Sequence, residues 1–482
     1  MGTLSNRKIA ILGFGREGQA ALKFLKRSAE YKDADLWILD KGINVKMPAR
    51  THNILGKEYL SSLNQFDIVF RSPGIPYMHP KLVAARKKGV RFSSATQLFF
   101  EYLASNVNGQ LSHVTVIGIT GTKGKGTTST LLYKILKAAR STGSGPMAGK
   151  HVFLAGNIGT PALEILPKLK KGSLVILELS SFQLQGLRHS PHIAVALGVF
   201  PDHQDAHRSL REYYDAKANI ARHQQKGDSI FYASENSVSR AIAKKSRGKK
   251  IAVSARTVPF LTQRDVRMPG AHNFFNAVTA AQVARALKVP PSVILRAVRA
   301  FKGNEHRLEL VRVIRAPRGT TRITSRRAQN FFRANQRLDQ RQSASIFFYN
   351  DSASTNPHTS AAAVRAFKNM PHVLIAGGHD KGLDYAPLAK ALKESNTKLV
   401  ILYGENKTKI ARAIKKSGVK IVFATTLESA VRTAYSVARS SMVNGQWSMV
   451  NVIFSPGAAS FDMFKNYSDR GKRFKKVVNG LT

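Results

Sequence analysis

The sequence of 482 residues contains no cysteine, and no apolar run approaches the roughly 18 residues that a membrane span needs. Disulfide bonds and thiolate chemistry are therefore excluded, and membrane insertion is not expected. The first segment, MGTLSNRKIAILGFG, passes from charged residues into a strand and a glycine turn, unlike a secretory signal. Asn6 stands where a myristoylation motif needs serine or threonine. We expect a cytoplasmic protein.

Acidic residues are scarce, because 28 Asp and Glu face 76 Lys and Arg and give a formal charge of +48. Such an excess makes nucleic acid a partner to consider. The basic residues are spread over the whole length, however, and no zinc-finger spacing, ribonucleoprotein motif or basic zipper concentrates them. An anion-rich interior or polyanionic substrates explain a diffuse excess equally well. We expect a monomer that does not act on nucleic acid.

Length and alternation predict an α/β protein of three domains. Residues 8–40 are expected to form strand, glycine turn, helix and strand, which is half of a dinucleotide-binding fold. The polar stretch SNVNGQ marks a boundary near residue 108. The three predicted domains are a Rossmann-like N-terminal domain, a central P-loop ATPase domain with a mainly parallel sheet, and a Rossmann-like C-terminal domain, over residues 1–108, 109–305 and 306–482.

Short apolar runs supply the strands of the second and third domains. In the second they are VTVIGIT, LVILELS, IAVALGVF and SIFYA, followed by the helical stretch GAHNFFNAVTAAQVARALKV. In the third they are SIFFYND, HVLIAGG, KLVILYG, KIVFA and NVIFSPG, separated by helical patterns. Residues 312–341 hold nine arginines against one acid, so we expect a solvated insertion over about 315–341, with anion or partner binding as the alternative.

The strongest chemical motif is GITGTKGKGTTS at residues 118–129, where a strand leads through glycines and Lys125 into a helix. Backbone N–H groups and the helix dipole at such a turn surround phosphates, and the lysine neutralises their charge. The motif departs from a Walker A sequence at Ile119 and at Gly126. Thr127 or Thr128 must therefore supply the hydroxyl that normally meets magnesium.

A second glycine turn, Gly13-Phe14-Gly15-Arg16-Glu17-Gly18, is followed by Asp40 at the end of the next expected strand. This spacing is typical of a dinucleotide fingerprint. The turn suits the diphosphate of NAD or of a UDP-sugar, or it serves only the packing of the helix.

Several polar residues follow expected strands. Glu178 ends an apolar strand, where a magnesium ligand is well placed. The segment PDHQDAH favours a polar surface turn over a metal site; its candidate ligands are Asp202, His203, Asp205 and His207. Lys217 lies on an expected helix and, taken alone, is a solvated lysine. Asp351 is either a carboxylate for nucleotide or metal, or a helix N-cap.

Taken together and in this order, these segments resemble the Mur ligase family over nearly the whole chain. SPGIP near residue 74 and the C-terminal SPGAASFDMFKNYSDRGKRF are most similar to its D-glutamate-adding members. The resemblance implies that ATP converts the L-alanine carboxylate of UDP-N-acetylmuramoyl-L-alanine to an acyl phosphate, which the amine of D-glutamate attacks. The expected activity is amide ligation in peptidoglycan synthesis.

The resemblance also implies roles for matching positions. The residues expected to act in catalysis are Lys125, Glu178, His203 and Lys217. The expected ATP contacts are Gly121, Thr122, Gly124, Lys125, Thr127, Thr128, Asn273, Asn276, Arg307 and Asp351. Two Mg²⁺ ions are expected, with the ligands Thr127, Glu178, His203 and a carbamylated Lys217. The expected precursor contacts are Gly13, Gly15, Gly18, Asp40, Ser72, Asn157 and Ser180. The expected glutamate contacts are Thr355, Lys381, Ser460 and Tyr467.

One more departure from the family's pattern leaves other functions open. Ala353 stands where the family usually has lysine, which removes one cation near the reacting groups. A related amide ligase with another acceptor, including one acting on folate, is the first alternative. The second is a nucleotide-binding or nucleic-acid-associated protein that keeps the fold without turnover.

Overall fold

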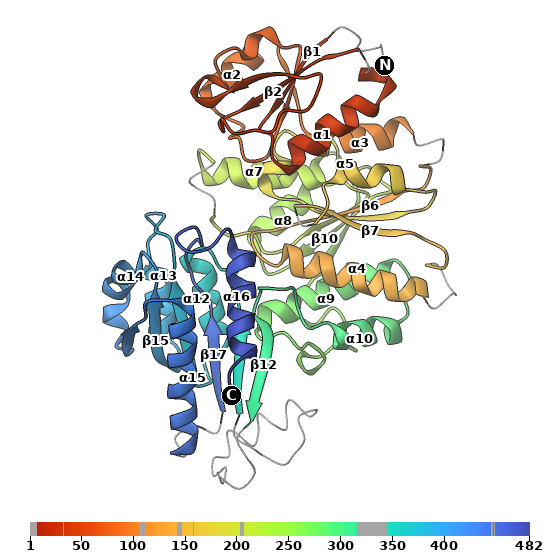
Figure 1. Cartoon of the computed structure of the whole chain (residues 1–482). Coiled ribbons are helices and arrows are strands. Elements are labelled where there is room, and N and C mark those ends of the chain that lie inside the picture. Colours follow the sequence, from red (N-terminus) through yellow and green to blue (C-terminus); the bar gives the residue numbers. More distant parts are fainter. Residues whose placement is uncertain are drawn as a thin grey trace. The chain divides into compact units, whose positions relative to one another are not determined.

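The computed structural model describes residues 7–31, 33–106, 109, 111–141, 147–157, 159–202, 207–315, 345–444, 447 and 449–482 (Figure 1). The chain forms two compact units, which are described in turn. The first joins Met1–Phe260 to Phe275–Ala297, and the second joins Leu261–Phe274 to Val298–Thr482. Among the described helices, none is both long and apolar enough to cross a membrane.

The first sheet has five parallel strands in the order β3-β2-β1-β4-β5. The strands are β1 Lys8–Leu12, β2 Asp35–Asp40, β3 His52–Leu55, β4 Ile68–Arg71 and β5 Arg91–Ser93. The helices are α1 Arg16–Arg27, α2 Pro80–Lys87 and α3 Ala95–Ser105, with short 3₁₀ turns at Ala29–Tyr31, Gly56–Glu58 and Leu63–Gln65. The predicted strand, glycine turn, helix and strand over residues 8–40 are confirmed.

The second sheet has six parallel strands in the order β11-β10-β9-β6-β8-β7. The strands are β6 Thr115–Thr120, β7 Val152–Gly156, β8 Leu174–Glu178, β9 Ile193–Ala196, β10 Ser229–Ala233 and β11 Lys249–Val253. The helices are α4 Lys125–Ser141, α5 Ala162–Ile165, α6 Ser181–Leu184, α7 Leu210–Arg222, α8 Ser237–Lys244, α9 Ala271–Ala286 and α10 Pro291–Ala300, with 3₁₀ turns at Leu166–Lys168 and Gln263–Asp265.

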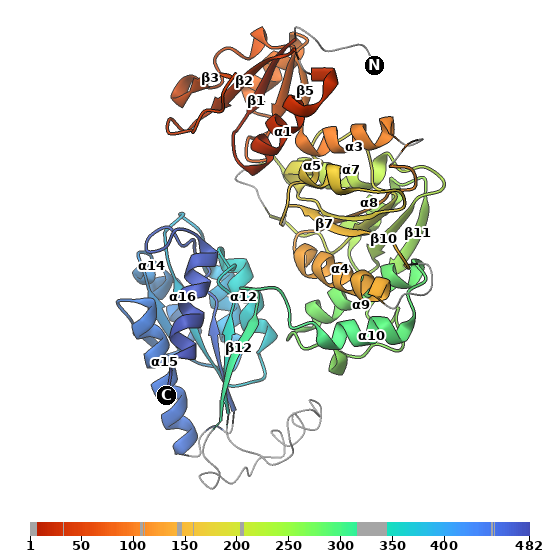
Figure 2. The same cartoon turned by 45° about the vertical axis from the view of Figure 1, so that its right-hand side comes forward.

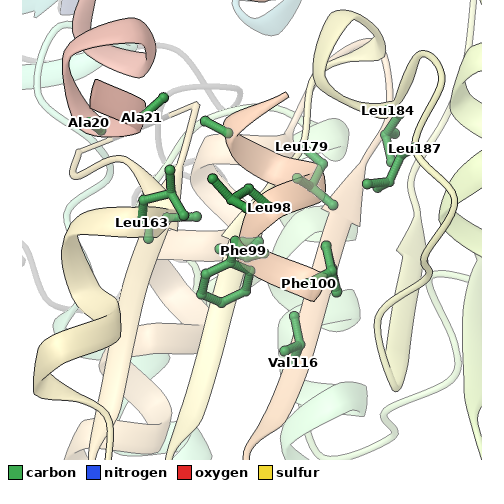
Figure 3. Packing of buried hydrophobic residues seen from close by; sticks show 14 of the residues in the cluster. Ala20, Ala21, Leu98, Phe99, Phe100, Val116, Leu163, Leu179, Leu184 and Leu187 are labelled. Carbon is green, nitrogen blue, oxygen red and sulfur yellow. The ribbon is translucent and has the colours of Figure 1, made fainter. Parts of the chain in front are cut away.

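The two sheets of the first unit share one hydrophobic core. Leu98 and Phe99 of α3 are buried with Ala20 of α1 and with Leu163 of α5, as Figure 3 shows. Leu184 at the end of α6 belongs to the same cluster. Because burial of apolar surface is the main favourable term in folding, this shared core holds the end of α6 in the same cluster as α1, α3 and α5.

Strand β11 stands at the end of the second sheet, and among the described strands it pairs with β10 alone. Its first two residues, Lys249 and Lys250, are exposed. Lysines on an outer strand discourage pairing with another chain.

The third sheet has the order β12-β13-β17-β14-β15-β16 and is parallel apart from β12, which runs antiparallel to β13. The strands are β12 Glu309–Arg315, β13 Ser345–Asn350, β14 His372–Gly377, β15 Thr397–Tyr403, β16 Ile421–Phe423 and β17 Met449–Phe454. The helices are α12 Pro357–Ala366, α13 Ala386–Lys393, α14 Lys407–Ile414, α15 Leu427–Val443 and α16 Tyr467–Asn479, with a 3₁₀ turn at Lys415–Ser417.

Helices cover both faces of the third sheet (Figures 1 and 2). Helices α15 and α16 pack on one face, and α12, α13 and α14 pack on the other. This doubly wound arrangement confirms the fold expected for the third domain.

The prediction of a solvated arginine-rich segment is wrong where that segment begins, because its first residues belong to strand β12. Arg312 and Arg315 are strand residues. The Arg312 guanidinium donates to the carbonyl oxygens of Val478, Asn479 and Leu481 at 2.9, 3.0 and 2.7 Å. Arg312 is therefore part of the fold, because pairing with β13 and these three bonds outweigh the polar composition of the segment. The remaining arginines of the expected insertion lie outside the described residues.

Candidate active site

The predicted phosphate turn connects the end of β6 to the start of α4. Gly121 has a φ of 152° and Gly124 a φ of 86°, which residues with side chains rarely adopt. A Cβ at Gly121 would lie 2.7 Å from that of Leu197, and one at Gly124 would lie 2.2 Å from Asn276 Oδ1. The turn therefore needs both glycines, and Asn276, an expected nucleotide contact, lies beside it.

Lys125 folds its side chain back over this turn. Its Nζ donates to the carbonyl oxygens of Gly121 and Thr122 at 3.0 and 3.1 Å. The ammonium group is thus held at the N-terminus of α4, where backbone N–H groups attract anions. This arrangement fits a phosphate-binding lysine.

Lys217 is buried in α7, so its interpretation as a solvated lysine is wrong. The residue is 1% exposed, and its Nζ donates to Gly121 O at 2.9 Å and to Thr120 Oγ1 at 3.5 Å. Burial, followed by the nearby Lys125 ammonium, holds the pKa of Lys217 well below its ordinary value, against the opposing effect of Asp202 and Glu178. Burial at the phosphate turn therefore favours the neutral form of the Lys217 amine.

Tyr213 is a neighbour of this site that the sequence interpretation missed. The Lys217 Nζ lies 4.8 Å from the centre of the Tyr213 ring, and the Tyr213 hydroxyl lies 2.9 Å from Thr122 Oγ1. Thr122 also binds both backbone groups of Phe200. The spacing of Tyr213 and Lys217, four residues apart on a helix, places both on one face and is the signal that could have found it.

Glu178 is the last residue of β8, as predicted, and is 2% exposed. Its Oε1 accepts a hydrogen bond from Asn157 Nδ2 at 2.9 Å. Its Oε2 is buried and has no hydrogen-bond partner among the described residues, and the same holds for Thr128 Oγ1 in α4. A buried carboxylate oxygen without a donor is costly, so this atom fits a hard cation such as Mg²⁺. Thr127 is 8% exposed, and both threonines lie in the first turn of α4.

The segment PDHQDAH is described only at its two ends, so the predicted magnesium ligand His203 lies outside the described residues. The negative charge of Asp202 raises the pKa of Lys217, against the larger effect of burial. His207 is buried, its Nε2 lies 3.0 Å from Ser181 Oγ, and its ring stacks on Phe182 with centres 5.1 Å apart. The interpretation as a surface turn is therefore wrong for His207, which packs against α6.

Ser180, an expected precursor contact, caps helix α6. Its Oγ accepts from the N–H of Gln183, and the Gln183 side chain accepts from the N–H of Ser180. The Gln183 Nε2 donates to Glu17 Oε1 at 2.8 Å, and burial raises the pKa of the Glu17 carboxyl. Ser180 is thereby linked to the glycine turn that carries Glu17.

The N-terminal glycine turn is closed by Asp40 and Ser72. The Asp40 carboxylate accepts from the N–H of Phe14 at 2.6 Å and of Gly42 at 2.7 Å. Ser72 Oγ donates to Gly13 O at 2.5 Å. Because the carboxylate oxygens of Asp40 bind backbone N–H groups, Asp40 stabilises the glycine turn. The segment SPGIP lies directly against that turn.

The two outer glycines of this turn are required by close packing, whereas the middle one is not. Gly13 has a φ of 86°, and a Cβ at Gly18 would lie 2.2 Å from Gly13 O. A Cβ at Gly15 would meet nothing within 4 Å, because Gly15 is the exposed N-cap of α1.

In the second unit, Asp351 holds a buried corner. Its Oδ1 accepts from the N–H of Leu308 at 3.2 Å and its Oδ2 from Ser455 Oγ at 2.7 Å. The N-cap of α12 is Asn356 instead, so the N-cap interpretation of Asp351 is wrong. Asp351 therefore fixes the backbone next to Arg307, another expected nucleotide contact.

The remaining predicted residues of this unit lie near the ends of its strands or helices. Asn273 Nδ2 donates to Pro269 O at 2.7 Å, and Lys381 lies 5.8 Å from the ring centre of Phe461. Ser460 is buried, whereas Tyr467, the first residue of α16, is exposed. Thr355 is partly buried just before α12.

Arg470 does not replace the missing lysine at Ala353. It is fully buried and donates to Ser352 Oγ and to the carbonyl oxygens of Ser352, Ala458 and Ala459. Its donors hold the backbone around Ala353 in place.

Three α/β sheets, with a lysine folded over the glycine turn of the second, fit the architecture expected of an ATP-dependent ligase that forms amide bonds. Three family models match the chain: "Mur ligase MurD-like, N-terminal domain" at residues 7–94, "Mur ligase middle domain" at 119–259 and "Mur ligase, glutamate ligase domain" at 336–444. The chain belongs to the Mur ligase family.

Curated relatives match along the whole chain. The UDP-N-acetylmuramoylalanine–D-glutamate ligase of Acetivibrio thermocellus is 33% identical and covers 99% of this chain and 97% of its own. The enzyme of that name from Symbiobacterium thermophilum is 31% identical and covers both chains fully.

Solved structures show the same fold at lower identity. The UDP-N-acetylmuramate-alanine ligase of Thermotoga maritima is 18% identical, has a TM-score of 0.53 and covers 98% of this chain and 99% of its own. Folylpolyglutamate synthase of Mycobacterium tuberculosis is 12% identical, has a TM-score of 0.52 and covers 80% of this chain and 96% of its own.

Proposed function

We propose that the protein joins D-glutamate to UDP-N-acetylmuramoyl-L-alanine, with ATP as the energy source, in peptidoglycan precursor synthesis. The observation that supports this most is the group around the phosphate turn, in which Lys125 and Lys217 bind the same carbonyl oxygen and Glu178 acts on Lys217. A lysine cation, a second buried lysine and a buried carboxylate at one phosphate turn suit phosphoryl transfer.

The reaction proceeds in two steps. An oxygen of the L-alanine carboxylate attacks the terminal phosphorus of ATP, and the bond to ADP breaks. The amine of D-glutamate then attacks the acyl carbon of this acyl phosphate, loses a proton, and expels inorganic phosphate as the amide forms. Catalysis rests on positioning and on offsetting phosphate charge, for which Lys125 is placed.

Lys217 is proposed to carry a carbamate. The neutral amine adds to carbon dioxide and releases one proton, and the product is an anionic oxygen ligand. The lowered pKa of Lys217 favours this addition, since only the unprotonated amine reacts. This group, Glu178, Thr127 or Thr128, and His203 are the residues that would hold magnesium, which would supply positive charge to offset that of the phosphates.

Further assignments belong to the same proposal. The precursor binds to Asn157, to Ser180 and to the turn with Ser72. ATP binds to Asn273, Asn276, Arg307 and Asp351. Glutamate binds to Thr355, Lys381, Ser460 and Tyr467. We also propose domains at 1–108, 109–305 and 306–482, a cytoplasmic location and a monomeric state.

A panel of acceptors tests the function directly. Purified protein receives UDP-N-acetylmuramoyl-L-alanine, ATP, Mg²⁺ and one amino acid at a time, including D- and L-glutamate. We expect phosphate release with D-glutamate only, and a product whose mass equals precursor plus glutamate minus water. Release with another amino acid, and none with D-glutamate, would overturn the proposed acceptor and favour a related ligase.

Ala353→Lys should increase activity, because it restores the cation that the family usually has there. Ala353 is partly buried, and its N–H donates to His306 O at 3.0 Å, so the backbone is fixed at this position. A charge-assisted hydrogen bond to a reacting group corresponds to roughly tenfold in kcat/KM for D-glutamate. Ala353→Gln serves as the uncharged control, and an equal effect of both would exclude the charge as the cause.

A further inference from the structure

Arg71, the last residue of β4, joins the two sheets of the first unit through a buried guanidinium. The residue is 3% exposed. Its Nη1 donates to Ile75 O at 2.6 Å and to Ser72 O at 3.4 Å, and its Nη2 donates to Phe182 O at 2.7 Å. We name residues 72–76 (SPGIP) the SPGIP loop. One side chain thus binds this loop and helix α6 together.

Burying the charge of Arg71 costs free energy, which indicates that the residue is needed for the geometry of its hydrogen bonds. Among the described residues, no carboxylate forms an ion pair with it. Burial lowers the pKa of Arg71 to about 10, although the Tyr77 phenol opposes this shift. A buried guanidinium compensated by carbonyl oxygens and by the Tyr77 ring, 5.3 Å away, without a carboxylate is expensive compared with an apolar side chain. What only arginine supplies is a planar fork that reaches two separate segments.

Further contacts join the residues just after the SPGIP loop to the chain around α6 and α7. The ring of Tyr77, just after the SPGIP loop, lies against Gly186, where a Cβ would come within 2.6 Å of the ring. Gly186 also has a φ of 80°. An Arg208 guanidinium nitrogen donates to Met78 O. The segment that follows the SPGIP loop thereby contacts Gly186, just after α6, and Arg208, just before α7.

Helix α6 carries these contacts to the reacting groups. It begins directly after Ser180 and three residues after Glu178. Asn219 of α7, two residues beyond Lys217, donates to Leu184 O at 2.9 Å at the other end of α6. A shift of α6 would therefore displace Ser180 relative to the phosphate turn.

We infer that Arg71 is a positioning residue for ligation, which keeps the SPGIP loop in register with α6 so that Ser72 and Ser180 receive the precursor in line with the phosphate turn. This inference rests on the proposed function. Arg71 acts through the backbone and does not touch the substrate. Its loss should affect precursor use and leave the binding of ATP unchanged.

The test compares Arg71→Met and Arg71→Lys with the unaltered protein. We expect the KM for the UDP precursor to rise about tenfold or more in both, because three carbonyl groups lose their donor in Arg71→Met and the single ammonium of Arg71→Lys cannot span both segments. The dissociation constant of ATP, measured by calorimetric titration, should stay within twofold. The unaltered protein is assayed first, so a failure of the proposed function appears there as absent ligation.

Arg312→Met is the matched control. Arg312 also binds three carbonyl oxygens, but all lie within the second unit. It should lower thermal stability without changing the precursor KM. An unchanged precursor KM in Arg71→Met, or an equal loss of ATP affinity, would show that Arg71 has a structural role only.

Gly186→Ala provides a second test in case Arg71→Met does not fold. A methyl group there displaces the Tyr77 ring and so moves the SPGIP loop without removing a charge. We expect the same raised precursor KM with unchanged ATP affinity. An unchanged precursor KM in folded Gly186→Ala protein would overturn the inference.

Discussion

Lys217→Ala should reduce the ligation rate on the order of a thousandfold, which is the loss expected when a preorganised charged group is removed from a phosphate site. The structural reason is that Lys217 is buried beside Gly121 O, where its amine has a pKa lowered by burial and by Lys125. Carbamate formation is measured with ¹³C-labelled bicarbonate, which should give a carbamate signal in the unaltered protein and none in the variant.

Small anions should partly restore the Lys217→Ala variant. Formate or chloride fits the space that the side chain leaves and supplies the negative charge that the carbamate would carry. Arg211→Ala, on the exposed side of the same helix, is the matched control and should keep full activity. Full activity of Lys217→Ala without added anions would show that no carbamate is needed.

Lys125→Met should weaken ATP binding and ligation by about two orders of magnitude, since a charged donor to phosphate is lost from a partly buried turn. Adenosine, which lacks phosphates, should bind both proteins equally in calorimetric titration. Lys137→Met, further along α4 and exposed, is the control. Equal ATP affinity in Lys125→Met would place the nucleotide elsewhere and refute the assignment of the turn.

The same variant has a second expected effect on Lys217. Because the Lys125 ammonium lowers the pKa of Lys217, its removal should raise that pKa. The carbamate signal should then require a higher pH to reach half of its maximum. A signal that keeps its pH dependence would mean that the Lys125 ammonium does not lower the pKa of Lys217.

The sequence predicted most of the fold because parallel strands buried on both faces are continuous apolar runs. The runs VTVIGIT, LVILELS and HVLIAGG coincide with β6, β8 and β14. Strands with partly exposed residues were missed, notably β11, which begins with two lysines, and β12, which carries Arg312. Their pairing depends on neighbours in the sheet, which local composition does not encode.

Site residues that directly follow a strand or a glycine turn were predicted correctly. The surroundings of a residue were missed where they come from distant segments of the chain. Glu178 lies at the end of β8 as expected. Periodicity placed Lys217 on a helix but did not show that it is buried against Gly121. Arg71 carried no signal beyond a cation after apolar residues, because Phe182, which it binds, lies 111 residues further along the chain.

The two lysines at the start of β11 bear on how copies of the protein meet. Two molecules that approached with these outer strands side by side would bring four ammonium groups together before any backbone bond could form. At 1 M salt this repulsion reaches only about 3 Å, so the barrier weakens. Concentrated stocks should therefore remain clear longest in dilute buffer, contrary to the usual practice of adding salt to basic proteins.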